Sequence, residues 1–211
     1  MQNGDDTSST LCKLGIIYQN LREYDQALIY HFRALTLRQL AQQTNPILIA
    51  RCFLGIANAY WGLDKLSDAL TYAQQALTIN ESVPSDNDLN IASNTAILAN
   101  IYYQYGDDIQ ALELSRRALA LFENCTSSES VMITTLLNNI GTIEVNIGLY
   151  DVALVTFIRA LNIVRRILPD GHPKRMAIEN NLHRWREIQE LNQTYSHSYL
   201  WHNLPKVLLG L

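Results

Sequence analysis

The chain has 211 residues, of which 48% are hydrophobic, so it has enough apolar material to bury a core. Its 16 basic and 20 acidic residues give a formal net charge of −4. This balance excludes the strongly basic surface typical of nucleic-acid binding, so no nucleic-acid partner is expected.

The N-terminal residues are polar and lack the basic start and the apolar core of a secretory signal. No stretch of the sequence has the apolar length needed to span a bilayer, so no membrane partner is expected and the predicted location is cytoplasmic. Three cysteines, Cys12, Cys52 and Cys125, are widely spaced without a CxxC pair. We interpret them as reduced thiols of the core or of a groove.

Four segments of the sequence superimpose without gaps, with alanine repeating every 42 residues at Ala27, Ala69, Ala111 and Ala153. A second alanine follows each of these, at Ala34, Ala76, Ala118 and Ala160. Small residues at such positions let two antiparallel helices approach closely, while large residues fill the space between neighbouring pairs. Each unit is therefore predicted to be a helical hairpin.

The predicted units occupy residues 8–42, 47–82, 88–124 and 130–168, with a partial fifth unit at 173–194. Turn signals lie at 21–25, 62–66, 105–108 and 148–151. In these turns glycine is expected to end the first helix, except at 21–25, which has none, and aspartate is expected to begin the second. Pro46 and Pro173 suit the first turn of the helix that follows each of them.

The predicted array covers residues 1–194. In the fifth unit the register places Tyr195 and His202 where a second helix needs small residues. Residues 195–211 are therefore expected to form a divergent cap or a foreign tail. The first helix is predicted to begin almost at Met1 with no capping segment before it, as in a piece of a longer chain.

This pattern resembles the tetratricopeptide repeat, in which alanine, phenylalanine and alanine recur at the spacing of Ala153, Phe157 and Ala160. The unit is longer than the family's usual length of about 34 residues. Its length is similar to that of the longer repeats of kinesin light chains. Asp170, His172 and Pro173, before the fifth unit, are similar to the Asp-His-Pro entry to the first helix in those proteins. The resemblance implies an all-α, right-handed superhelical solenoid of antiparallel helix pairs.

No GxGxxG, P-loop, GxSxG, HExxH or CxxC motif occurs, so neither an enzyme nor a cofactor is expected. Glu179, His183 and Glu187 would share one stripe of a helix. A metal ion would need closer convergence and a further ligand, so we interpret these three residues as ordinary surface or end-repeat contacts and expect no metal site.

The resemblance also implies that the first helices line a concave face. The register carries these residues onto it: Arg51, Asn58, Trp61, Asn100, Tyr103, Gln104, Asn138, Asn139, Asn146, Asn180, Asn181 and Arg184. An amide carries both a donor and an acceptor, so recurring asparagines can pair with the backbone of an extended peptide. They could instead be solvated helix positions, but asparagine is a poor interior helix former, which favours use in binding.

The predicted function is a non-enzymatic scaffold that binds a peptide or helix of a partner protein in this groove. The alternative is a fragment of a larger multidomain protein. Such a protein would be a kinesin-light-chain-like cargo adaptor, or would append the repeats to an enzyme domain such as a transferase.

Overall fold

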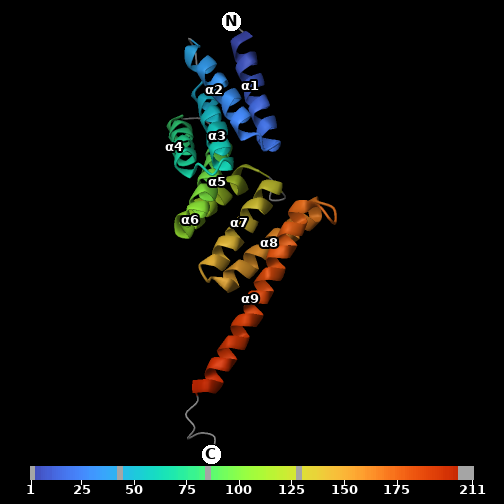
Figure 1. The fold of residues 1–211 in the computed structure, drawn as a ribbon. Coiled ribbons are helices and arrows are strands. Elements are labelled where there is room, and N and C mark those ends of the chain that lie inside the picture. Colours follow the sequence, from blue (N-terminus) through green and yellow to red (C-terminus); the bar gives the residue numbers. More distant parts are fainter. Residues whose placement is uncertain (1–2, 42–44, 84–86, 127–129, 204–211) are drawn as a thin grey trace, which may run out of the picture. The chain divides into compact units, whose positions relative to one another are not determined.

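The computed structural model describes residues 3–41, 45–83, 87–126 and 130–203, with side chains from 7 to 190 within those ranges. This part of the chain consists of nine α-helices without any strand, which confirms the predicted all-α class (Figure 1). The helices are α1 (Asn3–Asn20), α2 (Tyr24–Leu40), α3 (Pro46–Gly62), α4 (Leu66–Ser82), α5 (Asp88–Tyr105), α6 (Asp108–Cys125), α7 (Val131–Asn146), α8 (Tyr150–Ile167) and α9 (Pro173–Asn203).

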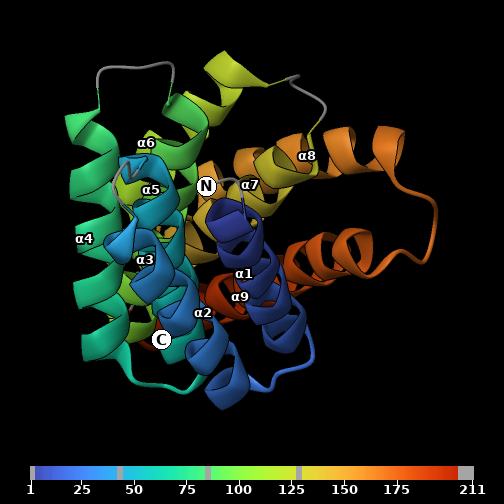
Figure 2. The ribbon, with the colours of Figure 1, turned by 90° about the horizontal axis from the view of Figure 1, so that it is seen from above.

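Consecutive helices pair as antiparallel hairpins that follow the four predicted repeats, as Figure 1 and Figure 2 show. The chain divides into two compact units. The first unit, Met1–Ser127, holds three hairpins, in which α2 packs on α3 and α4 packs on α5. The second unit, Ser128–Leu211, holds the α7–α8 hairpin and α9, which packs on both of these helices.

The alanines that define the repeat are buried where paired helices meet. Ala27, Ala69, Ala111 and Ala153 each have 0% of their surface exposed, as the register predicts. The second set of alanines is also fully buried, at Ala34, Ala76, Ala118 and Ala160. Because the helix backbones approach closely here, a larger side chain would have no room, which explains why the small residue recurs.

In the first unit, the ring of His31 fills a space between two glycines. His31 lies in α2 and is 1% exposed. A Cβ atom on Gly15 would stand 2.5 Å from its Nε2 atom, and a Cβ atom on Gly55 would also meet the ring. Both glycines therefore serve helix packing, since a side chain cannot share that volume with the imidazole.

The four hairpin turns share one geometry, in which a residue with left-handed backbone follows the first helix. That residue recurs every 42 positions, at Arg22, Asp64, Gly106 and Gly148. The prediction that glycine ends the first helix is confirmed at Gly62. Gly62 is the last residue of α3, where the ring of Tyr24 leaves no room for a side chain.

The predicted capping role of aspartate holds in one turn. Asp107 caps α6 by accepting a hydrogen bond from the Gln110 N–H at 3.1 Å. Elsewhere the prediction is wrong, because Asp25 and Asp151 lie inside the first turns of α2 and α8, after residues that form no side-chain cap. Their negative charge still favours a helix there, since the N-terminal end of a helix carries a partial positive charge.

The predicted role of proline at helix starts is confirmed. Pro46 and Pro173 are the first residues of α3 and α9. Before α3, the Asn45 side chain accepts a hydrogen bond from the Ile47 N–H at 3.0 Å. Parts of the predicted links between units, at 42–44, 84–86 and 127–129, lie outside the described residues.

Helix α9 runs on to Asn203 with no break at Tyr195, where the predicted array ends. Its last residues with described side chains include His183 and Arg186, both exposed. The equivalent residues of α7, Gly141 and Glu144, are buried against α8. A cap formed by 195–211 stays a prediction, since residues 204–211 and the side chains beyond 190 lie outside the description.

Two of the three free cysteines, Cys12 and Cys52, lie in the core as predicted, among Ala34, Leu35 and Ile56. The prediction is wrong for Cys125, which is exposed. Cys125 is the last residue of α6.

The outer face of α1 differs from the equivalent faces of later first helices. Ile17 is 51% exposed, whereas Ala59 and Ile101 are 0% exposed and Ile143 is 2% exposed. In α3 and α5 this face packs on the second helix of the preceding hairpin. In the part of the chain that the structure describes, no helix combines the length and the apolar character needed to cross a bilayer.

Candidate binding site

Side chains from three first helices and from the first turn line a hollow of about 470 Å³ in the first unit. We call it the α1–α3–α5 hollow, and its lining residues are Gln19, Arg22, Tyr24, Asn58, Trp61, Gly62 and Gln104. Three of the predicted groove residues, Asn58, Trp61 and Gln104, therefore meet in one place.

Two amide side chains of the hollow are held by hydrogen bonds. Gln19 Nε2 donates to the Gly55 carbonyl oxygen at 2.6 Å, and Gln104 Nε2 donates to Asp64 Oδ1 at 2.7 Å. Each bond uses one N–H group of a side chain that has two, and the amide oxygen remains an acceptor. The hollow thus presents oriented amides, together with the half-buried Asn58.

The hollow also has aromatic and cationic walls. Trp61 is half-buried, and its indole nitrogen is buried with no hydrogen-bond partner in the structure. Tyr24 adds a second ring, and Arg22 is the single charged residue of the lining. Stacking surfaces, amide groups and one cation suit a polar chain with apolar side groups, such as a peptide.

In the second unit, predicted groove residues bond to one another. Asn181 Nδ2, on α9, donates to Asn138 Oδ1 at 2.9 Å and to Thr142 Oγ1, also on α7, at 3.4 Å. Asn139 is half-buried. The Asn138–Asn181 contact fastens α9 to α7, so these two amides have a structural role whether or not they bind a ligand.

The remaining predicted residues lie outside the lining of the hollow. Arg51 and Tyr103 are exposed and Asn100 is half-buried in the first unit. In the second unit the remaining ones are exposed: Asn146, Asn180 and Arg184.

The predicted asparagines occupy four registers rather than one. Asn58 and Asn100 are one repeat apart, and further steps of 42 reach Thr142 and Arg184. Asn139 and Asn181 are also one repeat apart, but three positions earlier in the register. Asn138 and Asn180 form a further pair one repeat apart, and Asn146 stands at the register of Gln104. The 42-residue period therefore does not place asparagine at one equivalent position in all of the first helices.

Sequence reasoning missed Arg22 and Tyr24, which the structure places in the lining of the hollow. Both lie at the first hairpin turn, and the prediction considered only the first helices. The signal available in the sequence was the period, which aligns Arg22 with Gly106 and Gly148 at the turn. In the structure Arg22 has a φ of 63°, a conformation usual for glycine.

The residues weighed as metal ligands make ordinary contacts on and beside α9. Glu179 Oε1 lies 3.3 Å from Arg165 Nη2 and 3.3 Å from Arg175 Nε. His183 Nδ1 lies 3.3 Å from Glu187 Oε1 at the surface. Among the described residues, no three His, Cys, Asp or Glu side chains converge as a metal site would require.

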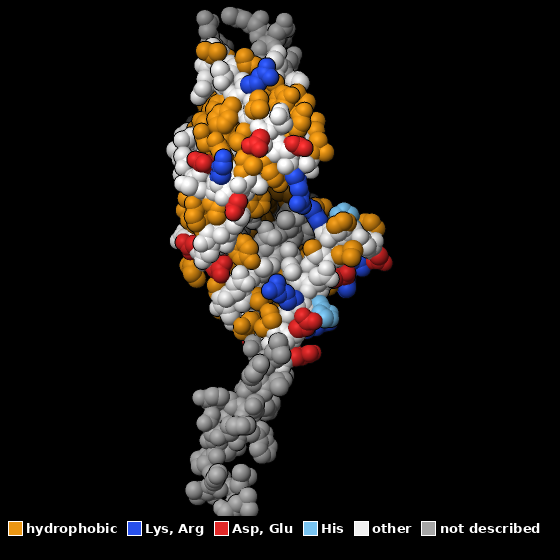
Figure 3. All heavy atoms as spheres, viewed as in Figure 1, with side chains coloured by type: hydrophobic (Ala, Val, Ile, Leu, Met, Phe, Trp, Pro, Cys, Tyr) orange, Lys and Arg blue, Asp and Glu red, His pale blue; other side chains and the backbone are white. Residues whose placement is uncertain are grey.

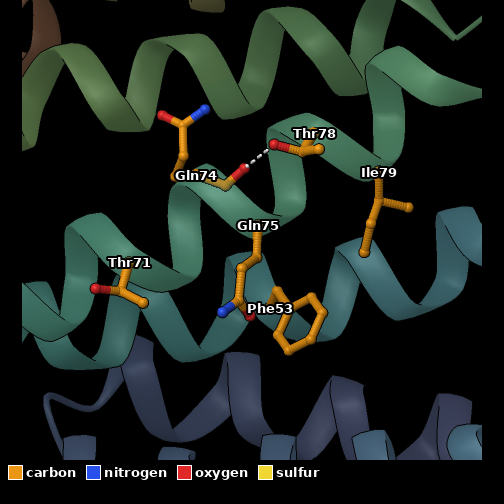
Figure 4. A pocket seen from close by; sticks show the side chains of 6 residues that line it. All are labelled: Phe53, Thr71, Gln74, Gln75, Thr78 and Ile79. Carbon is orange, nitrogen blue, oxygen red and sulfur yellow. Dashed lines mark hydrogen bonds between the residues drawn. The ribbon is translucent and has the colours of Figure 1, made fainter.

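A second hollow, of about 510 Å³, lies on α4 and is shown in Figure 4. Phe53 from α3 and Ile79 from α4 give it an apolar floor, and its other lining residues are Thr71, Gln74, Gln75 and Thr78. On the face drawn in Figure 3, acidic and basic side chains are interspersed, without a continuous patch of either sign among the coloured residues.

Antiparallel helix pairs that repeat every 42 residues define the chain as an α-helical repeat protein. Two models described as tetratricopeptide repeat match it, one at residues 6–82 and 48–124 and the other at 133–174. The first covers more than half of the sequence. The chain belongs to the tetratricopeptide repeat family, whose repeats support protein-interaction scaffolds that are generally non-catalytic.

Solved structures confirm the solenoid fold. BtubC (BKLC) from P. vanneervenii is 19% identical, with a TM-score of 0.69 over 90% of this chain and 82% of that one. A Podosopora anserina putative kinesin light chain with nearly identical TPR-like repeats is 16% identical, with a TM-score of 0.72 over 93% and 92%.

A Rap protein complexed with competence and sporulation factor is 18% identical, with a TM-score of 0.70. It matches 90% of this chain, which spans about half (49%) of the Rap chain. At these identities the likeness shows the fold alone. No curated protein sequence matches this chain significantly.

Proposed function

We propose that this chain is a non-catalytic scaffold that binds an extended segment of a partner protein in the α1–α3–α5 hollow. The observation that carries the proposal is the convergence of Gln19, Asn58 and Gln104 from three separate helices. Amides pair with a peptide backbone whatever its sequence, because each offers donors and an acceptor. The rings of Trp61 and Tyr24 add apolar contact area for side chains of the partner.

The structurally similar Rap protein, which is complexed with competence and sporulation factor, supports a binding role for this fold. We propose that binding in the first unit extends from the hollow to Asn100 and Tyr103, and that the second unit offers its own asparagines to a partner. In that unit Asn180 is exposed, whereas Asn138 and Asn181 bond to each other.

The experiment uses the purified chain to capture partner proteins, which are identified by mass spectrometry. Each partner is then shortened stepwise to the segment that still binds. Affinity is then compared for a double variant, Asn58→Ala with Asn100→Ala. Each hydrogen bond lost to the partner should weaken binding by about 0.5 to 1.5 kcal/mol, and the melting temperature of the free variant is measured alongside to separate loss of binding from loss of folding.

The matched control changes Gln74→Ala together with Arg116→Ala. These two residues are also one repeat apart, but they are exposed on the second helices α4 and α6. Loss of affinity in the control alone would mean that the partner uses the second helices and that the hollow is not the site. A further variant, Asn139→Ala with Asn180→Ala, tests whether the partner also reaches the second unit.

Alternatively, we propose that this chain is the repeat region of a longer protein that acts as a cargo adaptor. The likeness to a putative kinesin light chain structure favours it over a repeat region attached to an enzyme domain. Coding sequence that continues in frame upstream of Met1 in an intact transcript would support this alternative.

A further inference from the structure

Two cysteines that are far apart in the sequence meet in the core of the first unit. Cys12 of α1 and Cys52 of α3 have sulfur atoms 3.6 Å apart, although 40 residues separate them. Both are free thiols, 5% and 0% exposed respectively. A disulfide requires an S–S distance of about 2.05 Å, so the sulfurs are in contact and need only a short approach to bond.

A buried cation lies against this pair. Arg38, 2% exposed, donates from Nη1 to Cys52 Sγ at 3.1 Å. Its Nε atom donates to Ser8 Oγ at 3.2 Å, and Nη1 also donates to the Leu48 carbonyl oxygen. These contacts with α1 and α3 fix the guanidinium of Arg38 beside the sulfurs, where its charge favours a thiolate over a thiol.

The surroundings make the two sulfurs unequal. The hydrogen bond from Cys52 is the largest cause that lowers the pKa of the Cys12 thiol, and nearby His31 and Arg38 lower it further against the effect of burial. The hydrogen bond to Cys12 and then burial raise the pKa of Cys52. With Cys52 as the donor between the two sulfurs, Cys12 acts as the nucleophile and Cys52 supplies the proton, which is the division of roles found in stepwise thiol oxidation.

We propose that Cys12 and Cys52 are a redox modification site, at which a hydroperoxide converts the two thiols into a reversible disulfide that links α1 to α3. The Cys12 thiolate attacks the peroxide, which yields a sulfenic acid and hydroxide when the oxidant is hydrogen peroxide. The Cys52 sulfur then attacks the Cys12 sulfur, the S–S bond forms, and the S–OH oxygen leaves as water with the Cys52 proton. The two sulfurs lose two electrons in total, which the peroxide takes up.

This link would fasten the first hairpin to the second, because α1 belongs to one and α3 to the other. A cross-link between residues 12 and 52 also restricts the unfolded chain. The oxidised protein should therefore melt at a higher temperature than the reduced protein, and a dithiol reductant should reverse the difference.

The test uses the full chain with Cys125→Ser, which removes the exposed thiol that could link two molecules. The folded protein is treated with hydrogen peroxide and digested without reduction. The expected product is a Cys12–Cys52 linked peptide in a monomeric chain that has lost two hydrogens. Both thiols surviving in the folded protein, or a link that forms only after denaturation, would overturn the proposal.

Two single variants in the same background test the roles of the sulfurs. With Cys52→Ser, the sulfenic acid at Cys12 should persist and be trapped by dimedone. With Cys12→Ser, dimedone labelling of Cys52 should be at least about tenfold slower, since Cys52 is fully buried and burial raises the pKa of its thiol. Faster labelling of Cys52 would overturn the assignment. Circular dichroism checks that each variant is folded. If a single variant fails to fold, the linked-peptide experiment still tests the proposal, because it keeps both cysteines.

Discussion

The ring of Phe157 occupies the space in which a Cβ atom on Gly141 would stand, 2.7 Å from the ring Cε1 atom. The equivalent pairs in the earlier hairpins are Gly15 with His31, Ala57 with Ala73, and Ala99 with Ser115. Glycine thus faces a ring, and alanine faces a small residue. The space between the two helices of a hairpin is limited at this contact. A larger side chain on one helix therefore requires a smaller residue on the other.

Gly141→Ala should therefore lower the free energy of unfolding by about 1 to 3 kcal/mol, because the added methyl group overpacks the contact with Phe157. Denaturant titration of the variant gives this value. The control places Gly141→Ala in a Phe157→Ser background, which reproduces the Ala99–Ser115 pair. If the penalty is as large in the control as in the native background, the ring is not what excludes the side chain.

The shared turn geometry predicts opposite effects for two substitutions. Gly106 has a φ of 82° with open space around it, so Gly106→Ala should cost about 1 kcal/mol through backbone strain alone. Arg22 has a φ of 63°, so Arg22→Gly should raise stability by about 0.5 kcal/mol, the relief of strain exceeding the added freedom of the unfolded chain. Unfolding free energies that change in the same direction for both variants would contradict this account.

Glu144 stands at the register of Tyr18 and Tyr60, which stack on Tyr30 and Tyr72. Its carboxyl group is 1% exposed and accepts a hydrogen bond from Thr156 Oγ1 at 2.8 Å.

Thr156→Val keeps the shape of the side chain and removes this donor, so unfolding should become easier by about 0.5 to 1.5 kcal/mol. The measurement is a denaturant titration. Thr78→Val is the control, because its hydroxyl bonds only to a carbonyl of its own helix at the surface and its loss should have a smaller effect.

The lowered pKa of Cys12 predicts a pH dependence of stability. The unfolded thiol titrates near pH 8.5, whereas the folded one loses its proton at lower pH, so the native state binds fewer protons between these values. Stability from this group is therefore greatest above the unfolded pKa and is lost as the pH falls through the folded pKa. Unfolding free energies measured under reducing conditions from pH 5 to 8 should show this rise.

Cys12→Ser is the matched variant, because serine does not titrate in this range. Subtracting its unfolding free energy at each pH removes the contributions of all other groups. A difference that stays constant from pH 5 to 8 would show that folding does not change the proton affinity of Cys12 in this range.

The sequence by itself determined the hairpins, their 42-residue period and the buried alanines at their contacts. These follow from local rules, because a close helix contact needs a small residue at the same place in every unit. The alignment of Ala27 with Ala69, Ala111 and Ala153 therefore predicts their burial before any coordinates are known. The same register predicts that Asn58, Trp61 and Gln104 share a face.

Only the tertiary structure decided which residues complete the hollow and which thiols meet. Arg22 and Tyr24 enter the hollow because a left-handed turn, formed without glycine, carries them beside the first helices. Cys12 and Cys52 are 40 residues apart, so the 42-residue register does not align them. Their contact arises because α1 and α3 pack against each other with an offset along their axes, which side-chain packing sets and the repeat period does not reveal.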